Sequence, residues 1–199
     1  MIEYRKATEA DLPAIVDVHV QCFQGYFLTS LGKPLLLEFY KSFFYENNLF
    51  VVAYDNEKMI GFYMGHLNPS EARRNFEKKN SVRLFFKILL LCLKGDKNAI
   101  ERVTARLFKK KSDKTRLTFS RKVDATCLSA GVLPEYRRNN VATQLQKDFE
   151  TLLKQHNAKN YAGSVRPENI KIQKFFEKLG FEVIEKGTNG IRYMGNLED

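Results

Sequence analysis

Residues 125–145, ATCLSAGVLPEYRRNNVATQL, decide how the rest of the chain is organised. The apolar run broken by small residues predicts a strand, and the amphipathic pattern that begins at Val141 predicts a helix. The turn between them is rich in Arg and Asn, and Asn139 and Asn140 tolerate a positive φ almost as glycine does. Because the first amides of a helix lack intrahelical acceptors, we expect this turn to hold a phosphate or pyrophosphate.

The order and spacing of this stretch resemble the acetyl-CoA signature of the GNAT acetyltransferase superfamily. That signature has Gln or Arg, two variable residues, Gly, one variable residue, and Gly or Ala. The matching run here is Arg137, Arg138, Asn139, Asn140, Val141 and Ala142, preceded by the family-like Val132, Leu133, Pro134, Glu135 and Tyr136. Asn140 stands where Gly is usual, and Asn is the residue next most able to adopt the left-handed conformation.

A second resemblance to the same superfamily follows about 30 residues later. GNAT proteins commonly carry an Asn, an aromatic residue seven positions on, and a Gly-Phe pair at the end of the helix. Asn169, Phe176, Gly180 and Phe181 match this pattern. Many members have a Tyr that protonates the leaving thiolate where this chain has Phe176, which has no proton to give.

The resemblance implies that acetyl-CoA lies between the strands 125–132 and 161–165, which splay apart. Main-chain groups near Gly131, Val132 and Leu133 are expected to hold the pantetheine arm and polarise the thioester carbonyl. The implied cosubstrate-binding residues are Gly131, Val132, Leu133, Arg137, Arg138, Asn139, Asn140, Val141, Ala142, Thr143, Asn169 and Phe176. No cluster with metal-ligand spacing is evident, so we expect acetyl-CoA as the cosubstrate and no metal.

An amine acceptor must lose a proton before or during its attack on the thioester, so the site needs a base or a water chain that leads to one. The candidate catalytic residues are Glu135, His66 and Tyr193, with Asp124 and Tyr63 as further candidates for the base. The sequence does not rank them. The linker 24–30 either caps the core or borders the acceptor pocket, as the resemblance implies.

The predicted function is acetyl-CoA-dependent acetylation of a primary amine on a small molecule, with an amino sugar or sugar nucleotide as the class suggested by resemblance. Acetylation of a protein or peptide amine is the alternative enzyme function. From a different class, Asn140 and Phe176 suggest a non-catalytic GNAT module that binds CoA.

Composition and length favour one soluble domain over residues 1–199. The 199 residues are 44% hydrophobic and 28% charged, which is typical of a globular protein rather than a disordered one. The three cysteines, an odd number without paired spacing, predict free thiols in a reducing compartment. No signal peptide is visible at the start, and we expect a cytoplasmic protein.

Hydrophobic periodicity predicts a mixed α/β fold with a mainly antiparallel central sheet flanked by helices, as in GNAT proteins. The predicted helices are 9–23, 34–45, 141 to about 156, and 169–179. The predicted strands are 2–6, 49–54, 59–67, 125–132, 161–165, 181–184 and 191–194, with a turn at 187–190.

The chain departs from a compact GNAT protein in a helical insertion at about 68–119. Residues 68–122 contain 17 Lys and Arg against five Asp and Glu, so the basic excess of the whole chain lies in this segment. Residues 81–93 predict an apolar helix, and 98–111 a basic one. The first either packs its stripe on the core or on a second subunit, giving a homodimer, or docks on an anionic partner or membrane surface. Because the charge is localised, nucleic acid is not expected.

Overall fold

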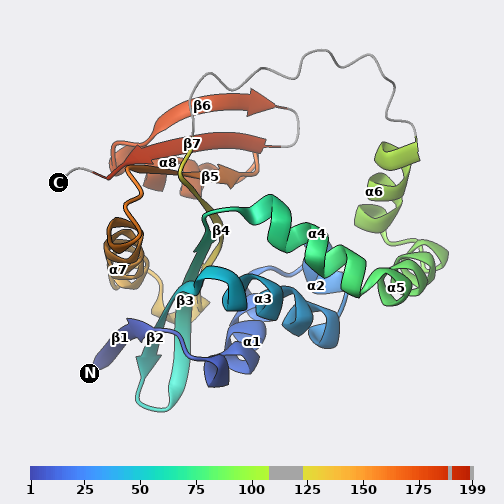
Figure 1. The fold of residues 1–199 in the computed structure, drawn as a ribbon, viewed down its shortest axis with the longest axis horizontal. Coiled ribbons are helices and arrows are strands. Elements are labelled where there is room, and N and C mark those ends of the chain that lie inside the picture. Colours follow the sequence, from blue (N-terminus) through green and yellow to red (C-terminus); the bar gives the residue numbers. More distant parts are fainter. Residues whose placement is uncertain (108–122, 188–189, 198–199) are drawn as a thin grey trace.

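The computed structural model describes residues 1–107, 123–187 and 190–197, and its strands form one seven-stranded sheet (Figure 1). The strands are β1 (Ile2–Lys6), β2 (Leu49–Asp55), β3 (Lys58–His66), β4 (Ala125–Val132), β5 (Asn160–Val165), β6 (Glu182–Gly187) and β7 (Gly190–Asn196). Their order is β1-β2-β3-β4-β5-β7-β6, and every neighbouring pair is antiparallel except β4 and β5. The predicted mixed α/β fold with a mainly antiparallel sheet is confirmed.

Helices cover both faces of this sheet. They are α1 (Leu12–Cys22), α2 (Phe27–Ser30), α3 (Lys33–Asn47), α4 (Pro69–Lys79), α5 (Ser81–Leu93), α6 (Lys97–Leu107), α7 (Val141–Gln155) and α8 (Ile170–Lys178), with single-turn helices η1 (Glu9–Asp11) and η2 (Pro134–Tyr136). Gly180 ends α8 with a φ of +77°, and the Phe181 N–H donates to the Phe176 carbonyl over 3.0 Å. This is the glycine helix stop expected from the sequence.

Two apolar cores lie on opposite faces of the sheet. One joins α1, α3 and α4 to the sheet through side chains such as Leu12, Phe43 and Phe62. The other joins α7 and α8 to the opposite face through Phe149 and Phe176. Because side chains alternate along a strand, β3 and β4 contribute to both cores, and they position residues on each side of the central opening described below.

The insertion contains one helix that the sequence did not predict. Helix α4 buries only Ala72 and Phe76, so its apolar pattern is weak, and Phe76 packs on Phe39 of α3 with ring centroids 5.5 Å apart. Helix α5 has the predicted bounds, and α6 begins at Lys97. The rest of the second predicted helix, 108–111, and residues 188–189 of the predicted turn lie outside the described residues.

Candidate active site

The central feature of the sheet is an opening between β4 and β5. These parallel strands pair only where Ala125–Cys127 meets Tyr161–Gly163, although β4 continues to Val132 and β5 to Val165. On its other edge β4 stays paired with β3 as far as Val132, with a register shift between Met64 and Gly65. Within the described part of the chain, the β5-facing edge of β4 therefore has no strand partner beyond Cys127, as the resemblance implied.

Main-chain direction decides which β4 groups face the opening. The Leu133 N–H donates to the Ile60 carbonyl over 2.9 Å, so it points toward β3. Since successive amides in a strand point to opposite edges, the Val132 N–H and C=O point toward the opening. Of the three residues expected to hold pantetheine, Val132 has main-chain groups that face the opening. The Leu133 N–H instead donates to the Ile60 carbonyl of β3.

Gly131 allows α1 to lie close against β4. A Cβ at this position would come within 3.3 Å of the Cys22 Sγ and of the Phe23 ring. That spacing is tighter than ordinary van der Waals contact, so a side chain at 131 would push α1 away from the strand. The absence of a side chain at Gly131 therefore lets α1 pack directly against β4 beside the opening.

The turn before α7 has two residues in the left-handed conformation, Arg138 (φ 69°) and Asn140 (φ 58°). The expectation that Asn140 replaces glycine conformationally is confirmed, whereas Arg138, not Asn139, takes the other positive φ. The Asn140 carbonyl accepts the Gln144 N–H over 3.0 Å, and its side chain makes no capping hydrogen bond. The first amides of α7, at Val141, Ala142 and Thr143, therefore have no intrahelical acceptor and are available to an anion.

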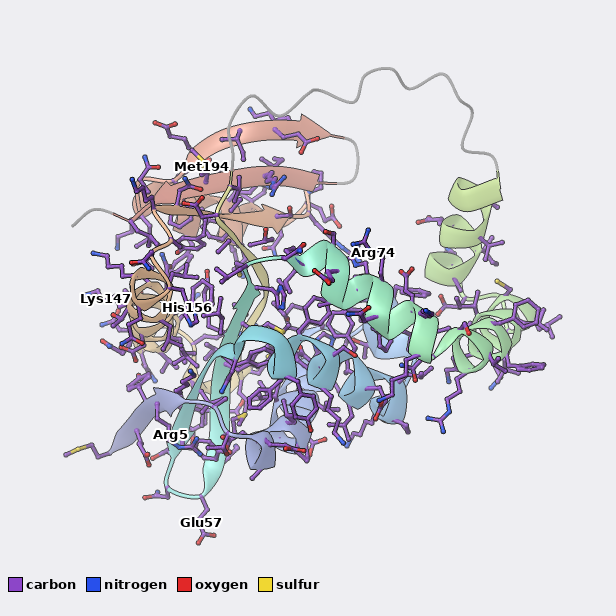
Figure 2. All side chains as sticks on the ribbon, viewed as in Figure 1. Arg5, Glu57, Arg74, Lys147, His156 and Met194 are labelled. Carbon is purple, nitrogen blue, oxygen red and sulfur yellow. The ribbon has the colours of Figure 1, made fainter. Side chains whose placement is uncertain are left out.

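A hollow of about 610 Å³ adjoins this turn. Its lining residues are Tyr4, Asn140, Thr143, Gln144 and Lys147. Lys147, in the second turn of α7, projects outward from the helix (Figure 2) and adds positive charge to the lining of this hollow. The side chain of Val141 is buried, so its contribution to an anion site comes from the main-chain N–H alone.

Arg137 ties the turn to the end of β4. Its Nε donates to the Val132 carbonyl over 3.0 Å. Its guanidinium also interacts with the Cys22 thiol: burial raises the pKa of this thiol, and Arg137 offsets part of that rise. The exposed Arg138 has no such restraint from β4. Arg137 thus orients the turn, and Arg138 remains the solvent-facing charge beside it.

The residues of the second motif have structural contacts. The Asn169 Oδ1 accepts the Ile172 N–H over 3.4 Å and so caps α8. Phe176 is buried over β5, where a Cβ at Gly163 would come within 3.1 Å of its ring, and it stacks on Tyr193 with centroids 5.4 Å apart. Their roles toward acetyl-CoA, which the resemblance implied, stay predictions.

The candidates for the base do not converge on one place. His66 is buried at the end of β3, where its Nδ1 accepts the Asn68 N–H over 2.9 Å and its ring packs edge-on against Phe43. The Asp124 carboxylate accepts the Lys159 N–H over 2.8 Å at the start of β4, the end opposite the α7 turn. Both side chains hold strand ends in place.

Glu135 lies in η2, on the exposed side of the turn. Its carboxylate pairs with Lys58 of the β2–β3 hairpin over 2.9 Å. A hydrogen bond with its own main chain, followed by the one from Lys58, lowers the pKa of Glu135. A lowered pKa makes this carboxylate a weaker proton acceptor.

The two tyrosine candidates lie on the α7 and α8 face of the sheet. Burial raises the pKa of Tyr193, whose hydroxyl donates to the Glu177 carboxylate over 3.4 Å. Burial also raises the pKa of Tyr63 well above its usual value, and its ring packs on Phe149. Raised values keep both phenols protonated near neutral pH, so neither is suited to accept a proton.

A buried polar group on the other face was missed by the sequence analysis. His19 of α1 lies within the helix predicted at 9–23, and its Nδ1 lies 2.7 Å from the Tyr40 hydroxyl of α3. The Tyr40 hydroxyl also lies 3.4 Å from the Ser129 Oγ of β4, to which it donates. Burial lowers the pKa of His19 to about 4 and keeps the ring neutral. Ser129 is half-buried on the part of β4 that β5 has left.

A second contact missed by the sequence analysis crosses the opening. The Arg166 guanidinium, directly after β5, lies over the Tyr26 ring with its Cζ 3.7 Å from the centroid. Tyr26 belongs to the linker between α1 and α2, and its ring also packs edge-on against Phe23. The linker 24–30, expected either to cap the core or to border the acceptor pocket, is therefore held to the end of β5 by a cation–π contact.

Comparisons with known proteins agree with this geometry. Residues 128–194, from β4 to β7, match the acetyltransferase (GNAT) domain family. No curated protein matches the sequence significantly. Among solved structures, SsHAT is 13% identical with a TM-score of 0.70, covering 100% of this chain and 99% of that chain.

Two further solved structures share the fold across nearly the whole length. PaiA N-acetyltransferase from Thermoplasma acidophilum, in complex with coenzyme A, is 15% identical with a TM-score of 0.62, covering 98% of this chain and 99% of that chain. The ribosomal-protein-S18-alanine N-acetyltransferase from Escherichia coli is 14% identical with a TM-score of 0.61, covering 100% and 96%. At such low identity these neighbours establish the fold alone.

Proposed function

We propose that the protein transfers an acetyl group from acetyl-CoA to a primary amine, because residues 128–194 match the GNAT acetyltransferase domain family and the described chain has the fold of GNAT proteins. The observation that carries this proposal is the left-handed turn at Asn140, which brings the free amides of α7 beside the open edge of β4. In the reaction the amine nitrogen bonds to the acetyl carbon, the C–S bond breaks, and CoA leaves as a thiol.

The chemistry of the open edge fits acetyl-CoA. The amides of Val141, Ala142 and Thr143 suit the pyrophosphate, and the exposed charges of Arg138 and Lys147 add attraction for the phosphates. The Val132 N–H suits a carbonyl of the pantetheine arm, because an extended chain pairs well with an open strand edge, while the Val132 C=O already accepts from the Arg137 Nε. An amide N–H on this edge also suits the developing negative charge on the thioester oxygen.

Ser129 is the residue we assign to the acceptor amine. Tyr40 donates to its Oγ, which leaves the Ser129 hydroxyl proton and a lone pair for a ligand in the opening. Tyr40 and His19 act as positioning residues, since they hold the Ser129 oxygen without reaching the opening themselves. With its pKa near 4, His19 is a poor final proton acceptor, so the amine proton leaves to water.

The test of this assignment is Ser129→Ala, with Ser164→Ala on the exposed part of β5 as the matched control. We expect Ser129→Ala to raise the KM for the amine or lower kcat by about tenfold, the effect of one lost hydrogen bond in a buried site, while CoA affinity stays unchanged. Tyr40→Phe should cause a smaller loss of the same kind. Equal kinetics for Ser129→Ala and Ser164→Ala would contradict the assignment.

The acceptor class we favour is a small anionic molecule, such as an amino sugar linked to a nucleotide. The 17 basic residues in 68–122 attract anions and oppose the approach of polycations such as polyamines. The Escherichia coli neighbour is an N-acetyltransferase of a ribosomal protein, so a peptide amine is the second candidate. A thiol-release assay with nucleotide-linked amino sugars, polyamines and peptides separates these classes.

A non-catalytic module that binds CoA is the alternative from a different class, and Phe176 is the observation that favours it. Phe176 is packed in the core and supplies no proton to a leaving thiolate. A thiol has a pKa of about 8.5, so it can leave without an acid. Direct titration with CoA, together with the thiol-release assay, separates the enzyme from the non-catalytic module. CoA binding without turnover of any amine would favour the module.

A further inference from the structure

Helix α5 is apolar on two faces, and only one of them packs on the protein. Its inner face contributes Leu91 to a small core with Leu31, Leu35 and Ala99. The outer face keeps six large apolar side chains between 45% and 77% exposed. They are Val82, Phe85, Phe86, Leu89, Leu90 and Leu93. Core packing therefore accounts for only part of the apolar stripe predicted from the sequence.

These six side chains form one continuous surface, which we call the outer face of α5. On a helix with 3.6 residues per turn they fall within one arc, and they extend along about 16 Å of helix axis. Figure 1 shows α5 at the edge of the molecule, beyond α2 and α3, and Figure 2 shows side chains projecting from it away from the rest of the chain. Contiguous exposed apolar surface of this kind marks an interaction site.

The charges around the outer face are mostly basic. Arg83 borders this face, whereas Lys87 lies on the inner side of α5, with its Nζ 3.9 Å from the position of a Cβ at Gly32. Lys78 and Lys79 end the preceding helix. Lys94 and Lys97 continue the series after α5. Lys79 pairs with Glu38 over 3.1 Å, but residues 68–107, the described part of the insertion, still carry ten basic against four acidic residues. The occupant of this face must be both apolar and anionic.

We propose that the outer face of α5 docks on an anionic lipid membrane. The helix would lie in the interface, with Phe85, Phe86 and the leucines below the headgroups and the basic side chains among the lipid phosphates. Among the described residues, no helix has the length and apolar character needed to cross a membrane.

Charge argues for a membrane over a second copy of this chain. A symmetric dimer across α5 would bring together two insertions that each carry a basic excess, and like charges in contact oppose association. An anionic membrane buries the same apolar side chains and neutralises the same charges. Both features of the insertion are then satisfied by one occupant.

Sedimentation with vesicles tests the proposal and does not depend on acetyl transfer. Vesicles of phosphatidylcholine alone are compared with vesicles containing phosphatidylserine, at low and at high salt. We expect binding to the anionic vesicles that falls as salt rises, because screening acts over about 8 Å at physiological salt. The double variant Phe85→Ser with Phe86→Ser should lower the partition coefficient by about tenfold or more.

The matched control replaces two exposed isoleucines of α8, Ile170→Ser with Ile172→Ser, and should leave vesicle binding unchanged. Circular dichroism and CoA titration establish that each variant is folded. Equal recovery with neutral and anionic vesicles at low salt would overturn the proposal. So would a dimeric mass in light scattering that the Phe85 and Phe86 variant abolishes, since a second copy would then cover the face.

Discussion

Asp11 shows how one carboxylate can join three segments of the fold. Its side chain accepts hydrogen bonds from Arg5 of β1 (2.7 Å), from the Thr8 N–H (2.7 Å) and from the Tyr54 hydroxyl of β2 (2.7 Å). Burial acts to raise the pKa of Asp11, but the hydrogen bonds from Arg5, Thr8 and Tyr54 outweigh it and hold the pKa well below its usual range. The spacing of Thr8 and Asp11 is that of a capping box, whereas the contacts of Asp11 with β1 and β2 form only in the folded chain.

The depressed pKa of Asp11 predicts sensitivity to acid. A carboxyl group whose pKa is lower in the folded than in the unfolded state stabilises the fold above the unfolded value, about 3.9, and loses that contribution as the pH falls toward the folded value. We expect Asp11→Asn to lower the free energy of unfolding at pH 7 by about 3 kcal/mol and to flatten its decline below about pH 4. Urea unfolding at several pH values measures both. Glu57→Gln, in the exposed β2–β3 turn, is the control and should retain the parental slope.

At the scale of elements, contact between α7 and the sheet depends on a glycine in β3. A Cβ at Gly65 would come within 2.8 Å of both the Phe149 ring and the Thr126 carbonyl oxygen. Since Phe149 is fully buried, its ring has no free space to move into. Gly65 therefore sets how closely α7, and the anion turn at its start, approach β3 and β4.

The variant Gly65→Ala is predicted to destabilise the fold by overpacking, by about 1–3 kcal/mol. Gly187→Ala is the matched control, because a Cβ there meets only the Gly190 carbonyl at an ordinary 3.6 Å. Its effect should stay within about 0.5 kcal/mol. Chemical denaturation measures the free energy of unfolding of both variants. Equal values would mean that α7 moves away from β3 without loss of stability, and would contradict the prediction.

Sequence patterns predicted elements better where the apolar period was strong. The apolar run of α5 gave its bounds, whereas α4, with Ala72 and Phe76 as its only buried positions among the described side chains, gave too weak a pattern. The anion turn followed from its register and from the conformational freedom of Asn140. The group of His19, Tyr40 and Ser129 did not, because its hydrogen bonds join residues 21 and 89 positions apart.

In the whole molecule, the candidate acetyl-CoA site and the docking surface lie in different parts of the chain. The sheet, α7 and α8 form the candidate acetyl-CoA site, while the insertion provides the basic and apolar surface. The inner face of α5 packs against Leu31, next to the linker whose Tyr26 reaches Arg166 across the opening. The acceptor side of the site and the docking surface are thus connected through one packed layer, which the sequence order did not indicate.

The central claim is that the turn at Asn140 holds the phosphates of CoA at the start of α7. Asn157, just after the end of the same helix, provides a matched control because it has the same residue type and the same left-handed conformation, with a φ of 57°. Asp at position 140 would put a carboxylate against the phosphates, whereas Asp at 157 adds the same charge far from them. Asn140→Gly keeps the backbone conformation available and should be tolerated.

The most direct measurement is calorimetric titration of CoA into the parent protein, Asn140→Asp, Asn157→Asp and Asn140→Gly. The account predicts that Asn140→Asp weakens CoA binding by about fivefold or more, which is about 1 kcal/mol or more, and that the other two variants bind CoA like the parent. If Asn140→Asp binds CoA as tightly as Asn157→Asp, the phosphates do not lie at this turn and the central claim is wrong.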